Sequence, residues 1–256
     1  MSETVILCEG PHDRAFWDGL LRLNHMGLKD ARSHAGTAIE GTAYDPRGLA
    51  VKGEGHFAYY SPSNNFVRLV PCGGKDKVMR AARLRLEERE TVELTRLVIN
   101  VDSDINADGT ESPASPIKVE AIANLVKRVD ATANVRDRSS IVLADGTEVS
   151  LVLWGATDAD TQGLPNQQTL ERLVCASICQ AYPDRGRCVH TWLENRVDKP
   201  APNVKDYSWS YMAGWYSDRG CDAFYKSLWS DNAIADALEH RLQESGIWQL
   251  AEQIAK

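Results

Sequence analysis

The sequence predicts an α/β protein with a mostly parallel sheet flanked by helices, followed by an all-helical C-terminal extension. Short apolar runs alternate with helix-like stretches over residues 1–157, whereas residues 158–256 are almost entirely helical in pattern. Parallel strands need a crossover connection, which is usually a helix, so this alternation favours a parallel sheet with helices on both faces. We therefore expect a first region at 1–157, interrupted by an insertion at about 26–65, and a second at 158–256 packed on it.

Each predicted strand is a short apolar run rich in β-forming residues that ends at glycine, proline or a charged residue. Each predicted helix has its apolar residues three or four positions apart. In chain order, these rules predict a strand at 4–8, a helix at 13–23, a strand at 56–60 within the insertion, a strand at 66–71, a helix at 75–88, a strand at 94–101 and a helix at 117–129. Further along, Asp145-Gly146 between two β-rich runs predicts a hairpin over 140–154. The remaining predicted helices are one that Asn166 or Thr169 caps and that ends at about 180, and three that cover 188–197, 221–229 and 233–253.

The composition excludes several classes of protein. Hydrophobic residues make up 43% of the chain and charged residues 25%, which excludes disordered and fibrous chains. With 29 basic and 36 acidic side chains, the net charge of −7 argues against nucleic-acid binding through overall charge alone. A nucleic acid would need a local basic path, for which the candidates are Arg80, Arg83, Arg85, Lys127 and Arg128.

The sequence also predicts the protein's compartment. No apolar run approaches the length of about 20 residues that a membrane-spanning helix needs, and the N-terminus lacks the pattern of a signal peptide. The six cysteines contain no CxxC pair and are expected to be mostly buried thiols. We expect a cytoplasmic protein that does not bind membranes.

Charged or glycine-rich residues follow three of the predicted strands. Glu9 and Gly10 follow the first strand, Gly73-Gly74-Lys75 the second apolar strand, and Asp102-Ser103-Asp104 the next. In open parallel sheets, ligands bind at the carboxyl ends of the strands. If the backbone stays extended, Asp102 and Asp104 point the same way, and a cation such as Mg²⁺ would offset their repulsion. With Glu9 from a neighbouring strand, they would form a three-carboxylate cluster suited to metal-assisted phosphoryl chemistry.

Other interpretations of the two aspartates stay open. A solvated acidic turn is common after a strand. An EF-hand calcium loop would begin at Asp102, but it has Ala107 where that loop needs glycine and Pro113 where it needs glutamate. A phosphatase with Asp102 as nucleophile and a glycosyltransferase DxD motif would each fit as well.

The order of these motifs resembles the Toprim domain, the metal-binding fold of topoisomerases, DnaG-type primases, ribosomal-RNA maturases and OLD-family nucleases. The resemblance rests on the runs VILCEGPHD (5–13), VRLVPCGGKDK (67–77) and VINVDSD (98–104), each beginning in an apolar strand. Residues 151–154, Pro165-Asn166 and the TLERL run at 169–173 are similar to the end of the domain in stand-alone Toprim-like proteins and OLD-type nucleases.

The resemblance implies roles for individual residues. Asp102 and Asp104 would hold Mg²⁺, for which Mn²⁺ would substitute. Glu9 would be a metal ligand or the general acid/base, and Asp13 would support the metal. Glu171 would hold a second ion, although a solvated carboxylate near a helix start is an equal alternative. Lys75 or Lys77 would stabilise the charge at the reacting phosphate.

Three functions follow as expectations. The first is Mg²⁺-dependent hydrolysis of phosphodiester bonds in DNA or RNA, as in a Toprim-type nuclease. The second is a non-catalytic Toprim-like module that binds nucleic acid or protein, and the third a DxD-containing phosphatase or nucleotidyl enzyme. The sequence has no GxxxxGK[ST] motif, so the ATPase that accompanies OLD-family Toprim domains would have to be a separately encoded partner. The aromatic cluster around Tyr211 is expected to be a packing core rather than a nucleic-acid contact.

Overall fold

The computed structural model describes residues 2–23, 26, 29–30, 56–110, 119–137, 139–157, 164–197, 206, 210–211 and 221–256. The chain divides into two compact units. The sheet unit contains Met1–Val101, Ile117–Val152 and Gln249–Lys256, and the helical unit contains Asp102–Pro116 and Leu153–Trp248. This division differs from the expected boundary at residue 157, because the segment that follows the strand at 94–101 groups with the helices and the last eight residues group with the sheet.

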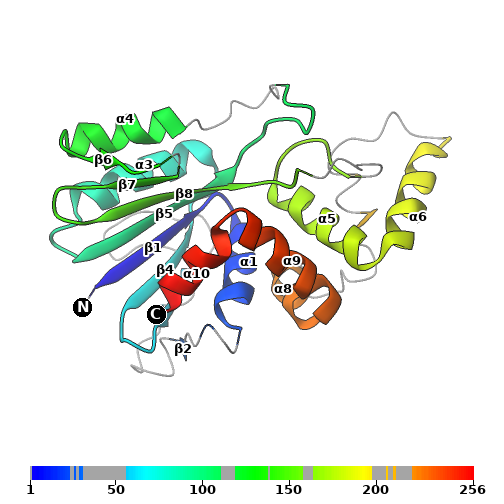
Figure 1. The fold of residues 1–256 in the computed structure, drawn as a ribbon, viewed down its shortest axis with the longest axis horizontal. Coiled ribbons are helices and arrows are strands. Elements are labelled where there is room, and N and C mark those ends of the chain that lie inside the picture. Colours follow the sequence, from blue (N-terminus) through cyan, green and yellow to red (C-terminus); the bar gives the residue numbers. More distant parts are fainter. Residues whose placement is uncertain are drawn as a thin grey trace. The chain divides into compact units, whose positions relative to one another are not determined.

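The sheet has the strand order β2-β3-β4-β1-β5-β8-β7-β6 (Figure 1). At its centre, β1 is parallel to both β4 and β5, whereas the hairpin strands at the two edges pair antiparallel. The α/β class predicted from the sequence is confirmed. The strands are β1 Glu3–Cys8, β2 Lys29–Asp30, β3 Phe57–Tyr60, β4 Phe66–Pro71, β5 Leu94–Asp102, β6 Asn134–Val135, β7 Ser140–Val142 and β8 Glu148–Trp154.

All six residues of β1 are buried, as expected for a strand with neighbours on both sides and helices on both faces. Cys8, its last residue, is paired with Pro71 on β4 and with Asn100 on β5. The three central strands therefore end at one edge of the sheet, and Glu9 lies at that edge. The predicted strand at 56–60 is confirmed as β3, which pairs with β4 and so belongs to the sheet, while residues 31–55 of the expected insertion lie outside the described residues.

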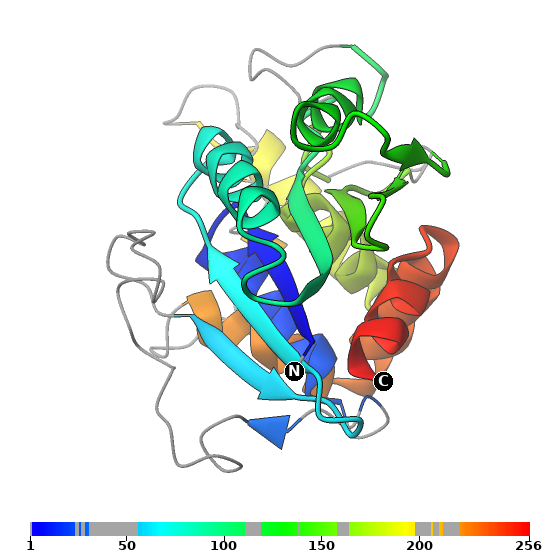
Figure 2. The same cartoon turned by 90° about the vertical axis from the view of Figure 1, so that its left-hand side faces the viewer.

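Helices cover both faces of the sheet unit. Figures 1 and 2 show α1 on one face and α3 and α4 together on the other. Their bounds are α1 Pro11–Leu21, α3 Lys75–Glu87 and α4 Val119–Val129. Two buried hydrogen bonds join α1 to β5 and β5 to β8. The Trp17 indole donates to the Asn100 side chain at 2.9 Å, and the Asn100 amide donates to the Val152 carbonyl at 3.4 Å.

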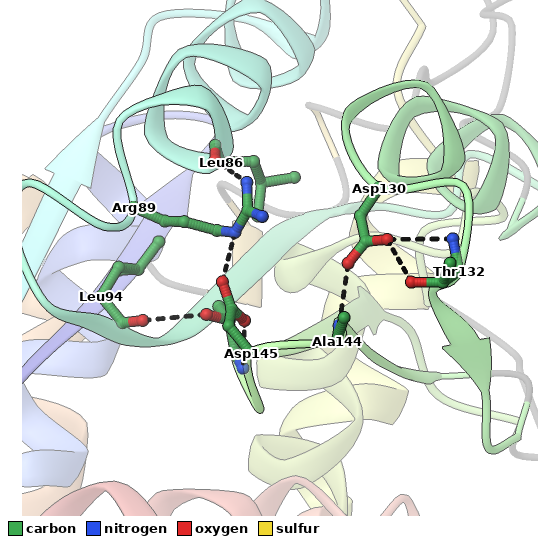
Figure 3. Close-up of polar contacts among 8 residues, drawn as sticks. Leu86, Arg89, Leu94, Asp130, Thr132, Ala144 and Asp145 are labelled. Carbon is green, nitrogen blue, oxygen red and sulfur yellow. Dashed lines mark hydrogen bonds and ion pairs between the residues drawn. The ribbon is translucent and has the colours of Figure 1, made fainter.

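Hydrogen bonds connect the turn of the β7–β8 hairpin to the residues that follow α3 and α4 (Figure 3). Arg89, just beyond α3, donates to the Asp145 carboxylate at 2.6 Å and to the Leu86 carbonyl at 2.9 Å. Asp130, just beyond α4, accepts from Thr132 and from the Ala144 backbone N–H. The hydrogen bonds from Thr132 are the main reason that the pKa of Asp130 is lowered. The predicted hairpin is confirmed.

The helical unit is organised around α5, which packs against α6 and α9. Gly246, with a φ of 76°, ends α9 and separates it from α10, so the single helix predicted at 233–253 is two helices. The helix predicted from residue 188 begins earlier, at Pro183, since proline is favoured in the first turn. The bounds are α5 Leu170–Ala181, α6 Pro183–Glu194, α8 Cys221–Ser227, a 3₁₀ turn at Leu228–Ser230, α9 Asn232–Glu244 and α10 Ile247–Ala255.

Among the described residues, the structure contains no helix with the length and apolar character needed to cross a bilayer. Of the aromatic residues expected to form a C-terminal cluster, only Tyr211 is described, and it is fully buried, as a packing role requires.

Candidate functional site

At the sheet edge where the central strands end, the backbone of Glu9 fixes the start of α3. The Glu9 carbonyl accepts the N–H groups of Gly73 at 2.9 Å and Gly74 at 2.8 Å, and the Cys8 carbonyl accepts the N–H of Cys72 at 2.9 Å. Both glycines have positive φ, at 78° and 127°, which other residues rarely adopt. The predicted Gly73-Gly74 turn is therefore attached to Glu9 through the backbone, and the Glu9 side chain takes no part in those bonds.

Lys75 and Lys77 both lie on the first turn of α3, next to this turn. Lys75 is half-buried and its ammonium nitrogen is shielded from solvent, so it is not the solvated lysine that a first helical turn usually carries. Lys77 is exposed, and its Nζ lies 3.5 Å from the position that a Cβ on Gly73 would take. Both ammonium groups thus belong to the same part of the sheet unit as Glu9.

Asp13 has a structural role in the sheet unit. Its carboxylate accepts the backbone N–H of Gly10 at 2.9 Å at the start of α1, and the residue is buried. Burial and, secondly, the negative charge of Asp13 raise the pKa of Cys72 to about 12, and the same two causes raise that of Cys8. A raised pKa keeps these thiols in the protonated form at neutral pH, which is the less reactive form of cysteine.

In the helical unit, the segment after β5 pairs with the segment that leads into α5. The Asp104 N–H donates to the Gln168 carbonyl at 3.1 Å, the Gln168 N–H to the Ile105 carbonyl at 2.8 Å, and the Ala107 N–H to the Asn166 carbonyl at 2.8 Å. This backbone pairing holds the predicted DxD motif against the start of α5.

The carboxylate of Asp102 contacts α5 directly. Its Oδ1 accepts the backbone N–H of Leu170 at 2.9 Å, while the Thr169 hydroxyl caps the same helix by accepting the N–H of Arg172 at 3.3 Å. The first N–H groups of a helix have no partner within the helix, so Asp102 satisfies one of them and complements the helix dipole. Asp102 is therefore a helix-capping residue, whatever else it does.

Asp104 differs from the sequence-based expectation. Its φ is 53°, in the left-handed region, so the assumption of an extended backbone that points Asp102 and Asp104 the same way is wrong. Aspartate tolerates this region better than most residues, because its short side chain can bond locally to the backbone. The residue is buried, with 8% of its surface exposed. A carboxylate in this position is not the solvated acidic turn that was one of the alternatives.

Glu171 is the second residue of α5 and is half-buried. Its charge is, after burial, the largest cause of the raised pKa of Cys175 one turn along the helix. The next residue, Arg172, is fully buried and donates to the carbonyls of Ala156 at 2.7 Å and Pro165 at 2.5 Å. Three of the predicted site carboxylates, those of Asp102, Asp104 and Glu171, thus belong to the helical unit, on two segments that are hydrogen-bonded to each other.

The EF-hand interpretation finds no support in the local geometry. The Asp108 carboxylate accepts the N–H of Thr110 at 2.9 Å and its hydroxyl at 2.6 Å, which lowers the pKa of Asp108 and forms an ordinary turn. Pro113 lies outside the described residues.

The described acidic residues match Mg²⁺ in their donor atoms but not in a preformed cluster. No group of three or more His, Cys, Asp or Glu side chains arranged to hold a metal ion occurs in the described part of the chain. The donor chemistry does suit Mg²⁺, which prefers carboxylate oxygens. Glu9 and Asp13 belong to the sheet unit, and Asp102, Asp104 and Glu171 to the helical unit.

The predicted basic path is wrong for one of its five residues, Arg85. Arg85 is fully buried and faces the interior of the sheet unit, where burial lowers its pKa and the charges of Glu3 and Glu88 raise it. It cannot contact a nucleic acid. Arg80, Arg83, Lys127 and Arg128 are exposed.

Comparison with known proteins yields a fold and no function. No family model matches the chain, and no curated protein matches it either. Among solved structures, the chain is similar to the crystal structure of hypothetical protein PH0156 from Pyrococcus horikoshii OT3, with a TM-score of 0.70 and 15% sequence identity over 100% of both chains. The protein therefore has the same α/β fold as that archaeal protein, and at this identity the likeness extends to the fold alone.

Proposed function

We propose that this chain is a Mg²⁺-dependent nuclease of the Toprim type, which hydrolyses phosphodiester bonds in DNA or RNA. The observation that carries the proposal is the attachment of the Asp102–Asp104 segment to the start of α5, through the Leu170–Asp102 hydrogen bond and the pairing with Gln168. This places Asp102 at the helix turn that bears Glu171, and Asp104 beside Gln168, two residues before that helix. An oxygen-only donor set is what Mg²⁺ requires.

The proposed roles follow the resemblance to Toprim domains. Asp102 and Asp104 would hold Mg²⁺ and Glu171 a second ion. Bound Mg²⁺ would polarise the phosphate and favour deprotonation of water. The participation of Glu9, as ligand or general base, and of Asp13 rests on the resemblance, because both belong to the other unit. Lys75, with its shielded ammonium group, would stabilise negative charge on the phosphate.

The capping role of Asp102 is compatible with this proposal. A carboxylate offers about four acceptor positions on its two oxygens, and the Leu170 N–H uses one of them, on Oδ1. The positive end of a helix dipole also favours a charged carboxylate at this position.

A second candidate function is a non-catalytic module that binds nucleic acid or protein. One observation favours it: Asp13 and Asp102 each have a structural role as acceptors at a helix start. In that case the acidic residues at the strand ends serve only the fold. Under either function, the resemblance to OLD-family proteins suggests a separately encoded ATPase as partner.

Metal binding is tested by thermal unfolding during a titration with Mg²⁺ or Mn²⁺. The informative variant is Asp102→Asn/Asp104→Asn, because an amide oxygen can still accept the Leu170 N–H and asparagine tolerates a positive φ. Asp108→Asn is the matched control on the same segment. At a metal concentration of 100 times Kd, the wild type and the control gain about 2.7 kcal/mol in unfolding free energy, and the double variant does not. An equal response of all three proteins rejects the metal site.

Catalysis is then tested with duplex DNA, single-stranded DNA and RNA, using Glu9→Gln as the inactive control. This substitution preserves the turn at Gly73-Gly74, since the Glu9 backbone carbonyl makes those bonds. Metal-dependent cleavage that Glu9→Gln abolishes supports the nuclease. Metal binding without turnover on any of these substrates favours the binding module.

A further inference from the structure

The outer side of α3 carries a row of three basic residues, Lys77, Arg80 and Arg83, which we name the basic stripe. All three are exposed, and they follow one another at three-residue spacing, so they are neighbours along one side of the helix. The opposite side of α3 packs against the sheet through Val78, Ala81, Ala82, Arg85 and Leu86. The stripe thus faces solvent along most of the helix.

The stripe is a local excess of positive charge in an acidic protein. The exposed charged side chains of α3 are three basic ones, Lys77, Arg80 and Arg83, and two acidic ones, Asp76 and Glu87, so this surface has a net charge of +1, whereas the whole chain has a net charge of −7. Neither Lys77 nor Arg80 forms an ion pair within the described part of the chain. Arg83 pairs with Glu87 at 2.7 Å, but both side chains are largely exposed, and such pairs are weak enough to exchange for a phosphate.

The stripe begins at the candidate site. The Lys77 Nζ lies over Gly73, and the Gly73 N–H donates to the Glu9 carbonyl. From Lys77 to Arg83 the helix rises about 9 Å, close to the rise of three phosphates along one strand of B-DNA. A backbone laid along the stripe would therefore lead to the sheet edge that carries Glu9.

We infer that the basic stripe is a docking surface for the phosphate backbone of a nucleic-acid duplex. This rests on the proposed function, since it names the substrate class of the same site. Charge complementarity identifies a polyanion, and the absence of aromatic side chains from both α3 and the adjacent α4 favours a duplex. Single strands are usually held by stacking of their bases on aromatic rings, whereas a duplex presents its phosphates outward. The last turn of α4 adds two exposed cations, Lys127 and Arg128.

The test measures binding of a fluorescent 24-base-pair DNA duplex in EDTA, where no metal-dependent cleavage occurs, over a range of salt concentrations. The variant is Arg80→Ala/Arg83→Ala, which leaves Lys77 in place, and the control is Arg187→Ala/Lys226→Ala on exposed helix positions of the helical unit. Loss of two phosphate contacts lowers the slope of log K against log salt by about 1.8 and the affinity at 0.1 M salt by about 60-fold. The control keeps the wild-type slope and affinity.

Unchanged affinity and slope in Arg80→Ala/Arg83→Ala overturn the docking surface, and equal or tighter binding of a single strand by the wild type overturns the assignment to a duplex. The thermal response to Mg²⁺ is measured on the same variant and is expected to equal that of the wild type. Stripe-dependent duplex binding with no Mg²⁺-dependent cleavage rejects the nuclease and leaves the docking surface. Mg²⁺-dependent cleavage together with duplex binding that does not depend on the stripe supports the nuclease and rejects the docking surface.

Discussion

Acid is expected to destabilise this protein in part by protonating the buried histidine His56. His56 directly precedes β3, is fully buried, and has no hydrogen-bond partner on either ring nitrogen within the described part of the chain. Burial, followed by the positive charges of Arg68 and Arg14, lowers the pKa of His56 from 6.5 to about 4. The folded protein therefore holds this imidazole neutral under conditions in which the unfolded chain would protonate it.

The sign and size of the effect follow from linkage. As the pH falls below 6.5, the unfolded chain binds the proton first, so stability is lost between pH 6.5 and pH 4, and above 6.5 His56 contributes no pH dependence. A lowering of 2.5 pKa units, from 6.5 to about 4, corresponds to about 2 kcal/mol of lost unfolding free energy at pH 5 and about 3 kcal/mol at pH 4.

The assay is urea denaturation at pH 7, 5 and 4 for the wild type, for His56→Leu, and for His240→Gln as a control at an exposed histidine. Carboxylates such as Asp130 also titrate at low pH, but they are common to all three proteins and cancel in the difference. We expect His56→Leu to lose about 2 kcal/mol less than the wild type between pH 7 and pH 5. If the three proteins show the same pH dependence, the imidazole is not held neutral and the reasoning fails.

Substitutions at three further contacts test the fold. Arg68→Met leaves Glu3 buried without its 2.9 Å ion pair and is expected to cost about 3–5 kcal/mol in urea denaturation, with Glu3→Leu/Arg68→Met less affected than the single variant. Gly186→Ala places a Cβ 2.6 Å from the Cys179 Sγ and is expected to lower the unfolding free energy by about 1–3 kcal/mol; a thermal melt equal to that of the wild type would contradict the close packing. Asp102→Ala in EDTA is expected to cost about 1–2 kcal/mol and Asp102→Asn less, and equal losses would mean that the acceptor oxygen is not what stabilises α5.

The order of the elements was predictable from the sequence because strands and turns leave local signals. The strand predicted at 66–71 is β4 without a change of bounds, since an apolar run ends there at two glycines. The burial of Arg85 also had a local signal: it lies seven positions after Val78 and three after Ala82, on the apolar side of α3. Its charge suggested exposure, but its helical position places it inside.

The geometry of the candidate site was not predictable in the same way. The segment after β5 forms backbone hydrogen bonds with Gln168, which lies more than sixty residues further along the chain. No short-range sequence pattern predicts that pairing. Asp104, whose backbone is in the left-handed conformation, takes part in the same long-range contact, because its N–H donates to the Gln168 carbonyl. Sequence spacing alone therefore predicts which carboxylates are candidates, but not the directions in which they point.

Acidic residues between a strand and a helix have two explanations that share one physical cause. The start of a helix presents unpaired N–H groups and the positive end of a dipole, so it stabilises a carboxylate such as Asp13 or Asp102 whether or not a metal binds. The hydrogen bond alone cannot distinguish a structural cap from a metal ligand, because both use the same oxygens. The charge does distinguish them, since an amide can accept a backbone N–H but is a poor substitute for a carboxylate as a ligand of Mg²⁺. Whether each of these aspartates is a structural cap or a metal ligand is therefore decided by what its asparagine variant loses.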